Sequence, residues 1–198
     1  SIISADRTCD KSVDFCLVDA ASSEETIRHI REVCNSITDR KIRICESSYR
    51  SSLAEAWNLG MMLTDNRYVV FASSDVMFWK TGWLELIKSA LPENQYILME
   101  NHAVFCLDKK AIPKMGWFDE NFNAGPHFDP DLMIRASENG VRQCNVGNDG
   151  FFQHGDEDDP EIARERTKKE IQDRLPMHDF HNEDYFKSKW SSPWVGWR

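Results

Sequence analysis

An apolar run at residues 68–72, with the sequence YVVFA, breaks abruptly into Ser73, Ser74 and Asp75. Such a short run of β-branched and aromatic residues predicts a strand, and it is the strongest strand signal in the chain. In open α/β sheets, ligands bind beyond the carboxyl ends of the strands. The residues that follow this strand are therefore the first place to look for a functional site.

The rest of the chain alternates between strand-like and helix-like patterns. Ser23 can cap a helix, Glu24 and Glu25 suit its first turn, and Gly140 suits a helix C-cap. We expect strands at residues 1–4, 15–19, 41–45, 68–72 and 96–99, and helices at 23–34, 53–63, 83–91, 130–139 and 161–175. This alternation predicts an α/β fold with a central, mostly parallel mixed sheet flanked by helices.

The length and charge of the chain limit the possible classes of protein. Its 198 residues suffice for one compact domain, so we expect a single domain over residues 1–198, cut from a longer chain. Neither a signal peptide nor a run of about 18 apolar residues is present, so no transmembrane segment is expected. With 33 acidic and 24 basic residues, the net charge is −9, which argues against a nucleic-acid partner.

Six cysteines are present, and none of them forms a CxxC pair, so a zinc knuckle is not expected. Several lie in apolar, strand-like surroundings. We expect buried, reduced thiols rather than disulfides, which indicates a reducing, cytoplasmic compartment.

Asp19 and Asp75 each follow a predicted strand, so both carboxylates are expected at the same rim of the sheet. The small residues Ser73 and Ser74 would let a nucleotide approach the backbone. A Mg²⁺ or Mn²⁺ ion commonly keeps one or two protein carboxylates and takes its other ligands from water and phosphate. The alternative is that Asp75 only caps the turn after its strand.

Three more residues are candidates for nucleotide contact. Asp6 and Arg7 follow the strand expected at 1–4. They could contact the base or ribose of a nucleotide, or they could form a surface ion pair. Arg50 could reach the base or a phosphate, or it could be an ordinary loop residue.

Short motifs along the chain resemble, in order, those of GT-A-type nucleotide-sugar glycosyltransferases. They are LVDAASSEET at 17–26, SLAEAWNLG at 52–60, YVVFASSD at 68–75, NHAVFCLDKKAIPKMGWFDENF at 101–122, DPDL at 129–132 with Arg135, and FFQH at 151–154. The resemblance runs from about Ser1 to His154. It implies a Rossmann-like GT-A domain that moves a sugar from a nucleoside diphosphate, UDP, to an acceptor hydroxyl on a glycan or glycoprotein.

The resemblance also assigns roles to individual residues. It implies that Asp19 contacts the nucleotide base and that Asp75 and His154 hold a Mn²⁺ or Mg²⁺ ion beside the diphosphate. Asp129 is the first candidate for the catalytic base and Asp131 the second. Otherwise these two acids are an N-cap and a first-turn acid of a helix that starts at Pro130.

Trp117 and Asp119, in the GWFDENF segment, are candidates for contact with the sugar or acceptor, although aromatic residues are more often part of a core. The chain departs from the family pattern at two points. The metal motif Ser73-Ser74-Asp75 lacks its first acid, and Phe128 stands where an acid usually precedes Asp129.

Other function classes compete with sugar transfer. A nucleotidyltransferase on a similar sheet is disfavoured because the chain has neither a GxGxxG nor a GxxxxGK[ST] phosphate loop. A non-catalytic carbohydrate- or nucleotide-binding module would use the seven Trp and eleven Phe residues, but it would not need acids at the strand ends. Within the GT-A enzymes, the chain resembles transferase domains that glycosylate viral capsids, which would place it in the cytoplasm of a host cell.

Overall fold

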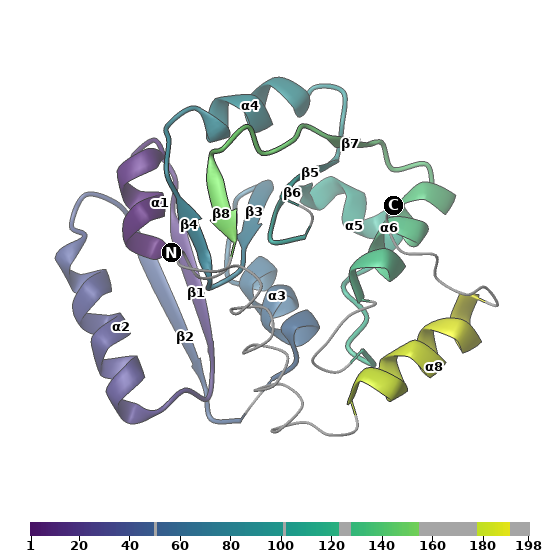
Figure 1. Ribbon diagram of the computed structural model, residues 1–198, viewed down its shortest axis with the longest axis horizontal. Helices are drawn as coiled ribbons and strands as arrows, with labels where there is room; N and C mark the ends of the chain where they lie inside the picture. The colour runs from purple at the N-terminus through teal and green to yellow at the C-terminus, as the bar shows by residue number, and fades with distance from the viewer. Residues whose placement is uncertain (50, 101, 123–127, 155–177, 191–198) are drawn as a thin grey trace.

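The computed structural model describes residues 1–49, 51–100, 102–122, 128–154 and 178–190. Strands lie between layers of helices (Figure 1), and the predicted α/β class is confirmed. The helix expected at 161–175 and the nucleotide candidate Arg50 lie outside the described residues.

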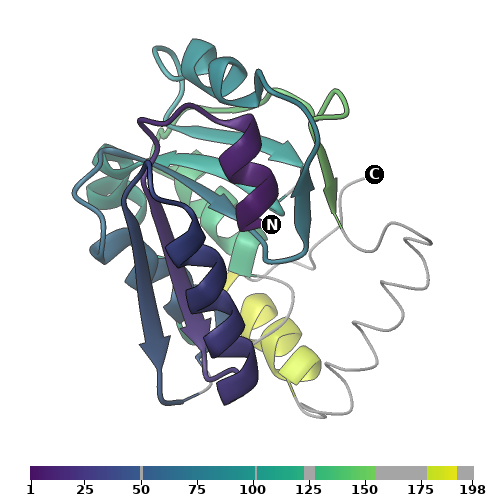
Figure 2. The same ribbon diagram turned by 90° about the vertical axis from the view of Figure 1, so that its left-hand side faces the viewer.

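One βαβ unit forms a side of the fold. The strands β1 (Phe15–Ala20) and β2 (Ile42–Ser47) run parallel and are connected through α2 (Glu24–Ser36). Figure 2 shows α2 lying along both strands. The predicted cap is confirmed, because the backbone N–H of Thr26 donates to the Ser23 hydroxyl at 3.2 Å.

A four-stranded sheet lies next to this unit in the order β3-β6-β5-β7. Its strands are β3 (Tyr68–Ala72), β5 (Tyr96–Glu100), β6 (Val104–Asp108) and β7 (Gln143–Asn145). The sheet is mixed, as predicted, but parallel pairing does not dominate among the described ladders. The reason is β6, a strand that the sequence analysis did not expect, which runs antiparallel to both β3 and β5.

Both faces of this sheet are covered. Along β6, Phe105 and Leu107 belong to one apolar cluster, and Val104 and Cys106 belong to the other. This alternation follows from the period of two in a strand. The first cluster lies under α3 (Leu53–Met62), and the second lies under α4 (Trp83–Ala90).

The strand expected at residues 1–4 is wrong, because α1 (Ile2–Thr8) occupies this position. A short apolar run does not by itself distinguish a strand from a helix. Contacts from the rest of the molecule favour the helix here. Ala5 is buried in the second cluster, and the Ser4 hydroxyl accepts a hydrogen bond from the backbone N–H of Phe78 at 3.1 Å.

A short antiparallel pair, β4 (Val76–Phe78) with β8 (Phe152–His154), follows the central strand β3. The remaining elements are η1 (Lys109–Ala111), α5 (Ile112–Met115), α6 (Phe128–Glu138) and α8 (His178–Trp190).

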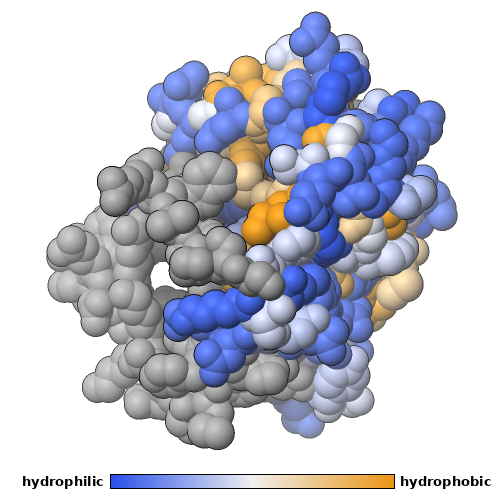
Figure 3. Space-filling view, turned by 90° about the vertical axis from the view of Figure 1, so that its right-hand side faces the viewer, coloured by the Kyte–Doolittle hydropathy of each residue, from blue (hydrophilic) through white to orange (hydrophobic). Residues whose placement is uncertain are grey.

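All six cysteines are unpaired thiols, and Cys34 and Cys106 are buried. None of the helices in the described ranges has the length and apolar character needed to cross a membrane. On the face drawn in Figure 3, the described surface is mostly hydrophilic, with smaller hydrophobic patches.

Candidate functional site

The central strand β3 ends in a tight turn that carries three of the predicted residues. The backbone N–H of Ser73 donates to the carbonyl of Ala103 at 2.9 Å, and the N–H of Val76 donates to the carbonyl of Ser73 at 3.1 Å. The turn leads directly into β4. Asp75 therefore lies at the carboxyl end of β3, as the sequence predicts.

Asp75 faces His154. Because β4 and β8 pair with Val76 opposite His154, the Nε2 atom of His154 lies 3.2 Å from Oδ2 of Asp75. The His154 side chain is 41% exposed and the Asp75 side chain is 47% exposed, so the pair is open to solvent. The hydrogen bond from His154 outweighs partial burial and lowers the pKa of the Asp75 carboxyl, which keeps it ionised at neutral pH.

The chemistry of this pair fits a divalent cation. Carboxylate oxygen and imidazole nitrogen are both ligands for Mn²⁺, and a hard cation of this kind readily completes its shell with phosphate and water. Within the described ranges, no group of three or more His, Cys, Asp and Glu side chains is arranged to hold a metal. The Asp75–His154 pair would therefore supply two ligands of a cation from the described residues.

Asp129 is held by a buried histidine. The Nδ1 atom of His102 lies 3.0 Å from Oδ2 of Asp129, and Nε2 of the same ring lies 2.6 Å from the hydroxyl of Tyr96. Tyr96 and His102 are buried, whereas the Asp129 side chain remains 28% exposed. The Asp129 carboxylate is thus partly exposed to solvent, while the buried His102 and Tyr96 side chains hold it from the protein side.

Both acidic positions are connected to the same end of the sheet. His102 directly precedes Ala103, whose carbonyl is bound to the turn at Ser73. That turn carries Asp75, and the His102 ring holds Asp129. The register between β3 and β6 therefore places Asp75, and the His102 that contacts Asp129, at the carboxyl end of β3.

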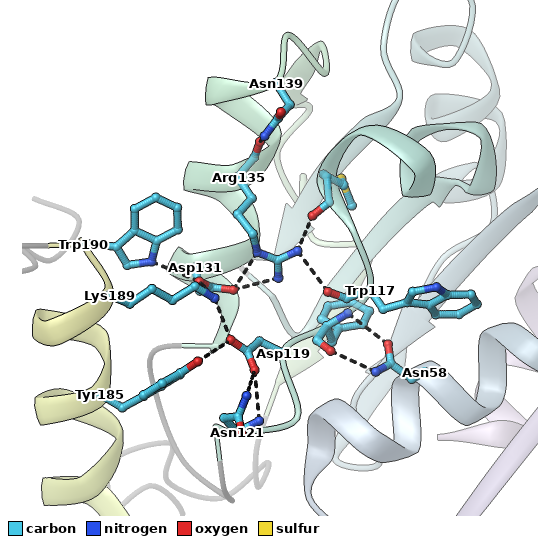
Figure 4. Close-up of polar contacts among 12 residues, drawn as sticks. Asn58, Trp117, Asp119, Asn121, Asp131, Arg135, Asn139, Tyr185, Lys189 and Trp190 are labelled. Carbon is cyan, nitrogen blue, oxygen red and sulfur yellow. Dashed lines mark hydrogen bonds and ion pairs between the residues drawn. The ribbon is translucent and has the colours of Figure 1, made fainter.

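Asp131, the second candidate base, is fully buried and saturated with hydrogen bonds. Its Oδ2 accepts from Nε and Nη2 of Arg135 at 2.8 and 2.7 Å. Its Oδ1 accepts from the indole N–H of Trp190 at 3.0 Å and lies 2.8 Å from Nζ of Lys189 (Figure 4). Asp131 is placed to hold helices together.

Asp119 lies in the same network, where it contacts Tyr185 and Lys189 of α8 (Figure 4). Its Oδ2 accepts from Nζ of Lys189 at 2.6 Å and from the hydroxyl of Tyr185 at 2.8 Å, and its Oδ1 accepts from the backbone and side chain of Asn121. Burial alone would raise the pKa of the Asp119 carboxyl. The hydrogen bonds outweigh burial and lower this pKa to about 2.

The loop that carries Trp117 is fixed from both sides. Asn58 of α3 binds the backbone N–H and carbonyl of Phe118 at 3.0 and 2.9 Å, and Arg135 donates to the carbonyl of Trp117 at 2.9 Å. Gly116 has φ +78°, and a Cβ there would lie 3.3 Å from Nη1 of Arg135, so glycine suits this position. The Trp117 side chain stays exposed.

The predicted nucleotide residues fall in two places. Asp19 is buried at the carboxyl end of β1, where Oδ2 accepts from the backbone N–H of Ser22 at 3.1 Å. Asp6 lies on α1 and pairs with the buried Arg40, with Oδ1 2.8 Å from Nε, and with Lys11. Arg7 is exposed on the same helix. Of the two interpretations given for Asp6, nucleotide contact or an ion pair, the structure contains the ion pair.

Sequence reasoning did not identify His102, Tyr96 or Lys189 as functional residues. His102 occurs in the quoted NHAVF segment, but nothing in the local pattern links it to Asp129. The helix α6 begins at Phe128, so Asp129 lies inside its first turn rather than at the expected cap before Pro130.

Residues 2–147 match the family described as glycosyl transferase family 2. No curated protein matches the sequence.

Several solved structures share the fold. The mannosyltransferase PcManGT from Pyrobaculum calidifontis, in complex with GDP-Man and Mn²⁺, has a TM-score of 0.68 at 13% identity over 86% of this chain. GalNAc-T7 with UDP, GalNAc and Mn²⁺ has a TM-score of 0.64 at 8% identity over 96% of this chain. S. aureus TarS has a TM-score of 0.65 at 10% identity over 94%.

At such low identities the likeness shows the fold, which is the GT-A fold. The chain spans 56% of the mannosyltransferase chain, 53% of the GalNAc-T7 chain and 39% of the TarS chain.

Proposed function

The chain belongs to glycosyl transferase family 2, and we propose that it transfers a sugar from a nucleoside diphosphate to an acceptor hydroxyl. One observation supports this proposal most. The solvent-open Asp75–His154 pair and the partly exposed Asp129, through His102, are both connected to the same end of β3. The Asp75–His154 pair suits the binding of the donor's diphosphate through a cation. The Asp129 carboxylate suits contact with the acceptor hydroxyl.

In this proposal Asp75 and His154 hold a Mn²⁺ or Mg²⁺ ion. Asp75 and His154 would hold such a cation where it would neutralise the charge that develops on the departing diphosphate. Ser74 is small and exposed beside Asp75, which leaves room for phosphate oxygens at the turn. Ser73 fixes the turn, because its N–H and carbonyl are both used within the protein.

Asp129 is the proposed base. As the acceptor oxygen bonds to the anomeric carbon, the bond from that carbon to the diphosphate oxygen breaks, and the acceptor proton passes to the Asp129 carboxylate. Asp129 is preferred to Asp131 because it is partly exposed, whereas Asp131 is buried with both oxygens occupied. We therefore assign Asp131 to holding α6 in place.

The donor is proposed to be a uridine nucleotide whose base lies near Asp19. The solved relatives carry either GDP-Man or UDP, so the fold accommodates both kinds of nucleotide. Asp6 is assigned to the ion pair with Arg40, and Arg7 stays a candidate for donor contact.

The acceptor is proposed to be a glycan or glycoprotein. The exposed ring of Trp117, on a loop fixed by Asn58, offers a flat apolar surface of the kind on which sugars stack. Because the sequence resembles transferase domains that glycosylate viral capsids, we propose capsid glycans in the host cytoplasm as the acceptors to test first.

A donor panel tests the proposal. Purified protein is incubated with UDP-sugars and GDP-sugars, with Mn²⁺ or with EDTA, and nucleotide release and sugar transfer are measured. We expect release from at least one donor with Mn²⁺, and a loss of at least about 10²-fold in EDTA and in Asp75→Ala, since the cation carries the leaving-group charge. Metal-independent release, or an equally active Asp75→Ala, would contradict it.

A further inference from the structure

A chain of three side chains leads from the core of the sheet to the proposed base. Tyr96, on β5, is buried within the sheet, and its hydroxyl lies 2.6 Å from Nε2 of His102. The opposite ring nitrogen of His102 lies 3.0 Å from Asp129. Both contacts are within hydrogen-bond distance, and of the three side chains only Asp129 is partly exposed to solvent.

The chemistry of the three groups sets the direction of the hydrogen bonds. An ionised carboxylate can only accept, so Nδ1 of His102 must carry a proton that it donates to Asp129. In a neutral ring Nε2 is then the acceptor, and the Tyr96 hydroxyl is the donor. Burial, with a smaller contribution from the Asp129 charge, raises the pKa of Tyr96 well above its usual range, so the phenol keeps the proton that it donates.

We propose that His102 is a positioning residue for Asp129, and that Tyr96 fixes the His102 tautomer that this role requires. The proposal rests on the function above, in which Asp129 is the base. His102 occupies Oδ2 of the carboxylate and leaves Oδ1 for the acceptor hydroxyl. When Asp129 takes up the acceptor proton, the proton on Nδ1 stays on the ring.

This arrangement explains why a base can work from the first turn of a helix. A first-turn carboxylate on a solvent-exposed helix can rotate among several rotamers. The hydrogen bond from a buried, doubly anchored ring removes that freedom. The productive orientation is thus present before the acceptor binds.

Steady-state kinetics test the proposal with matched variants. His102→Gln and Tyr96→Phe change the buried chain, while His29→Gln and Tyr68→Phe make the same substitutions at exposed positions. Misplacement of a reacting group can cost about 10²-fold, so we expect His102→Gln to lose about that factor in kcat with little change in the donor KM. Tyr96→Phe should lose about tenfold, and the two exposed controls should match the wild type.

A double-variant cycle separates positioning from a general structural effect. If His102 acts through Asp129, adding His102→Gln to Asp129→Asn should cause no further loss of kcat, whereas independent roles would add. Wild-type turnover in Asp129→Asn would reject the proposed base. A low Asp129→Asn activity together with an unaffected His102→Gln would overturn the positioning role and leave the base assignment standing.

Nitrogen-15 NMR of the histidine rings gives a readout that needs no substrate. We expect His102, assigned by eliminating the signals lost in single His→Gln variants of the other five histidines, to show the neutral Nδ1–H tautomer in the wild type. Tyr96→Phe should change its Nε2 shift, and Tyr68→Phe should not. An Nε2–H tautomer, or a ring unaffected by Tyr96→Phe, would overturn the proposal, including in the case that His102→Gln does not fold.

Discussion

At the scale of single residues, Asp129 and Asp131 are only two positions apart but have opposite environments. Asp129 keeps part of its side chain in solvent, and Asp131 is enclosed by Arg135, Lys189 and Trp190. The helical period explains this difference, because neighbours two apart point to different sides of a helix. The two acids can therefore be separated by parallel substitutions.

We expect Asp129→Asn to lower kcat by about 10²–10⁴-fold, since Asn cannot take up the acceptor proton. Its carbonyl oxygen can still accept from His102, so stability should change by less than about 1 kcal/mol, the value of a first-turn charge. Asp131→Asn should do the reverse and mainly lower the melting temperature. Turnover near the wild-type level in Asp129→Asn would shift attention to a mechanism without a protein base.

Asp19 gives a second prediction at this scale. The substitution Asp19→Asn keeps an oxygen that can accept from Ser22 but removes the charge. If Asp19 contacts the nucleotide base, the preference among UDP, GDP and CDP should change in Asp19→Asn while the fold is retained. Competition calorimetry measures this preference, and an unaltered ranking would remove Asp19 from the base site.

At the scale of elements, α8 is joined to the loop around Asp119 and to α6 by one lysine. The Nζ atom of Lys189 lies 2.6 Å from Asp119 and 2.8 Å from Asp131. Tyr185 and Trp190 add one hydrogen bond each (Figure 4). This segment, far along the chain from the predicted motifs, thus supports the helix that carries the proposed base.

We expect Lys189→Met to lower the free energy of unfolding by about 3 kcal/mol, because it removes the cation shared by the buried Asp131 and the partly buried Asp119. Urea denaturation measures the effect. Lys187→Met is the control, since Lys187 forms an exposed pair with Glu183 on the same helix. Equal effects of the two substitutions would show that α8 is not held by this network.

The Asp119 carboxyl makes the attachment of α8 to the rest of the protein depend on pH in a defined way. Its pKa is lowered from 3.8 to about 2 in the folded protein, so its contribution to stability is complete above about pH 4 and is lost as the pH falls through about 2. The gap in melting temperature between wild type and Asp119→Asn should therefore narrow over this window. The corresponding gap for the exposed Asp65→Asn should stay small throughout.

The sequence predicted those elements whose signals are local. The Ser23 cap, the strand at 68–72 and the helix at 83–91 needed only neighbouring residues, and each is present with nearly the same bounds. The strand β6 was not predicted because both of its faces are buried, so its short apolar run has no alternation to identify it.

The site residues, like the elements, divide into those that local sequence patterns predict and those that depend on distant contacts. Asp75 was placed by the rule that ligands bind after strands. Its contact with His154 depends on a pairing between β4 and β8 that no local pattern encodes, and only the family resemblance suggested it. His102 was missed because its role depends on two partners from other elements, Tyr96 and Asp129.

At the scale of the whole molecule, the central sheet acts as the fixed frame for the site. Both of its faces are covered by apolar clusters, which hold the strands between layers of packed side chains. Three contacts across the chain then converge beside the end of β3: Ser73 with Ala103, His102 with Asp129, and Asp75 with His154. A sugar transferase needs such a frame, because its donor and acceptor must be aligned to react.

The central claim is that this rim holds a nucleoside diphosphate through a divalent cation. Isothermal titration of UDP and GDP, with and without Mn²⁺, tests it on the wild type, Asp75→Ala and the exposed control Asp65→Ala. We predict that the wild type and Asp65→Ala bind at least one nucleotide in a Mn²⁺-dependent manner. Asp75→Ala should lose at least about tenfold in affinity, which corresponds to 1.4 kcal/mol. Wild-type binding that ignores Mn²⁺, or an Asp75→Ala variant that keeps full affinity, would contradict the account.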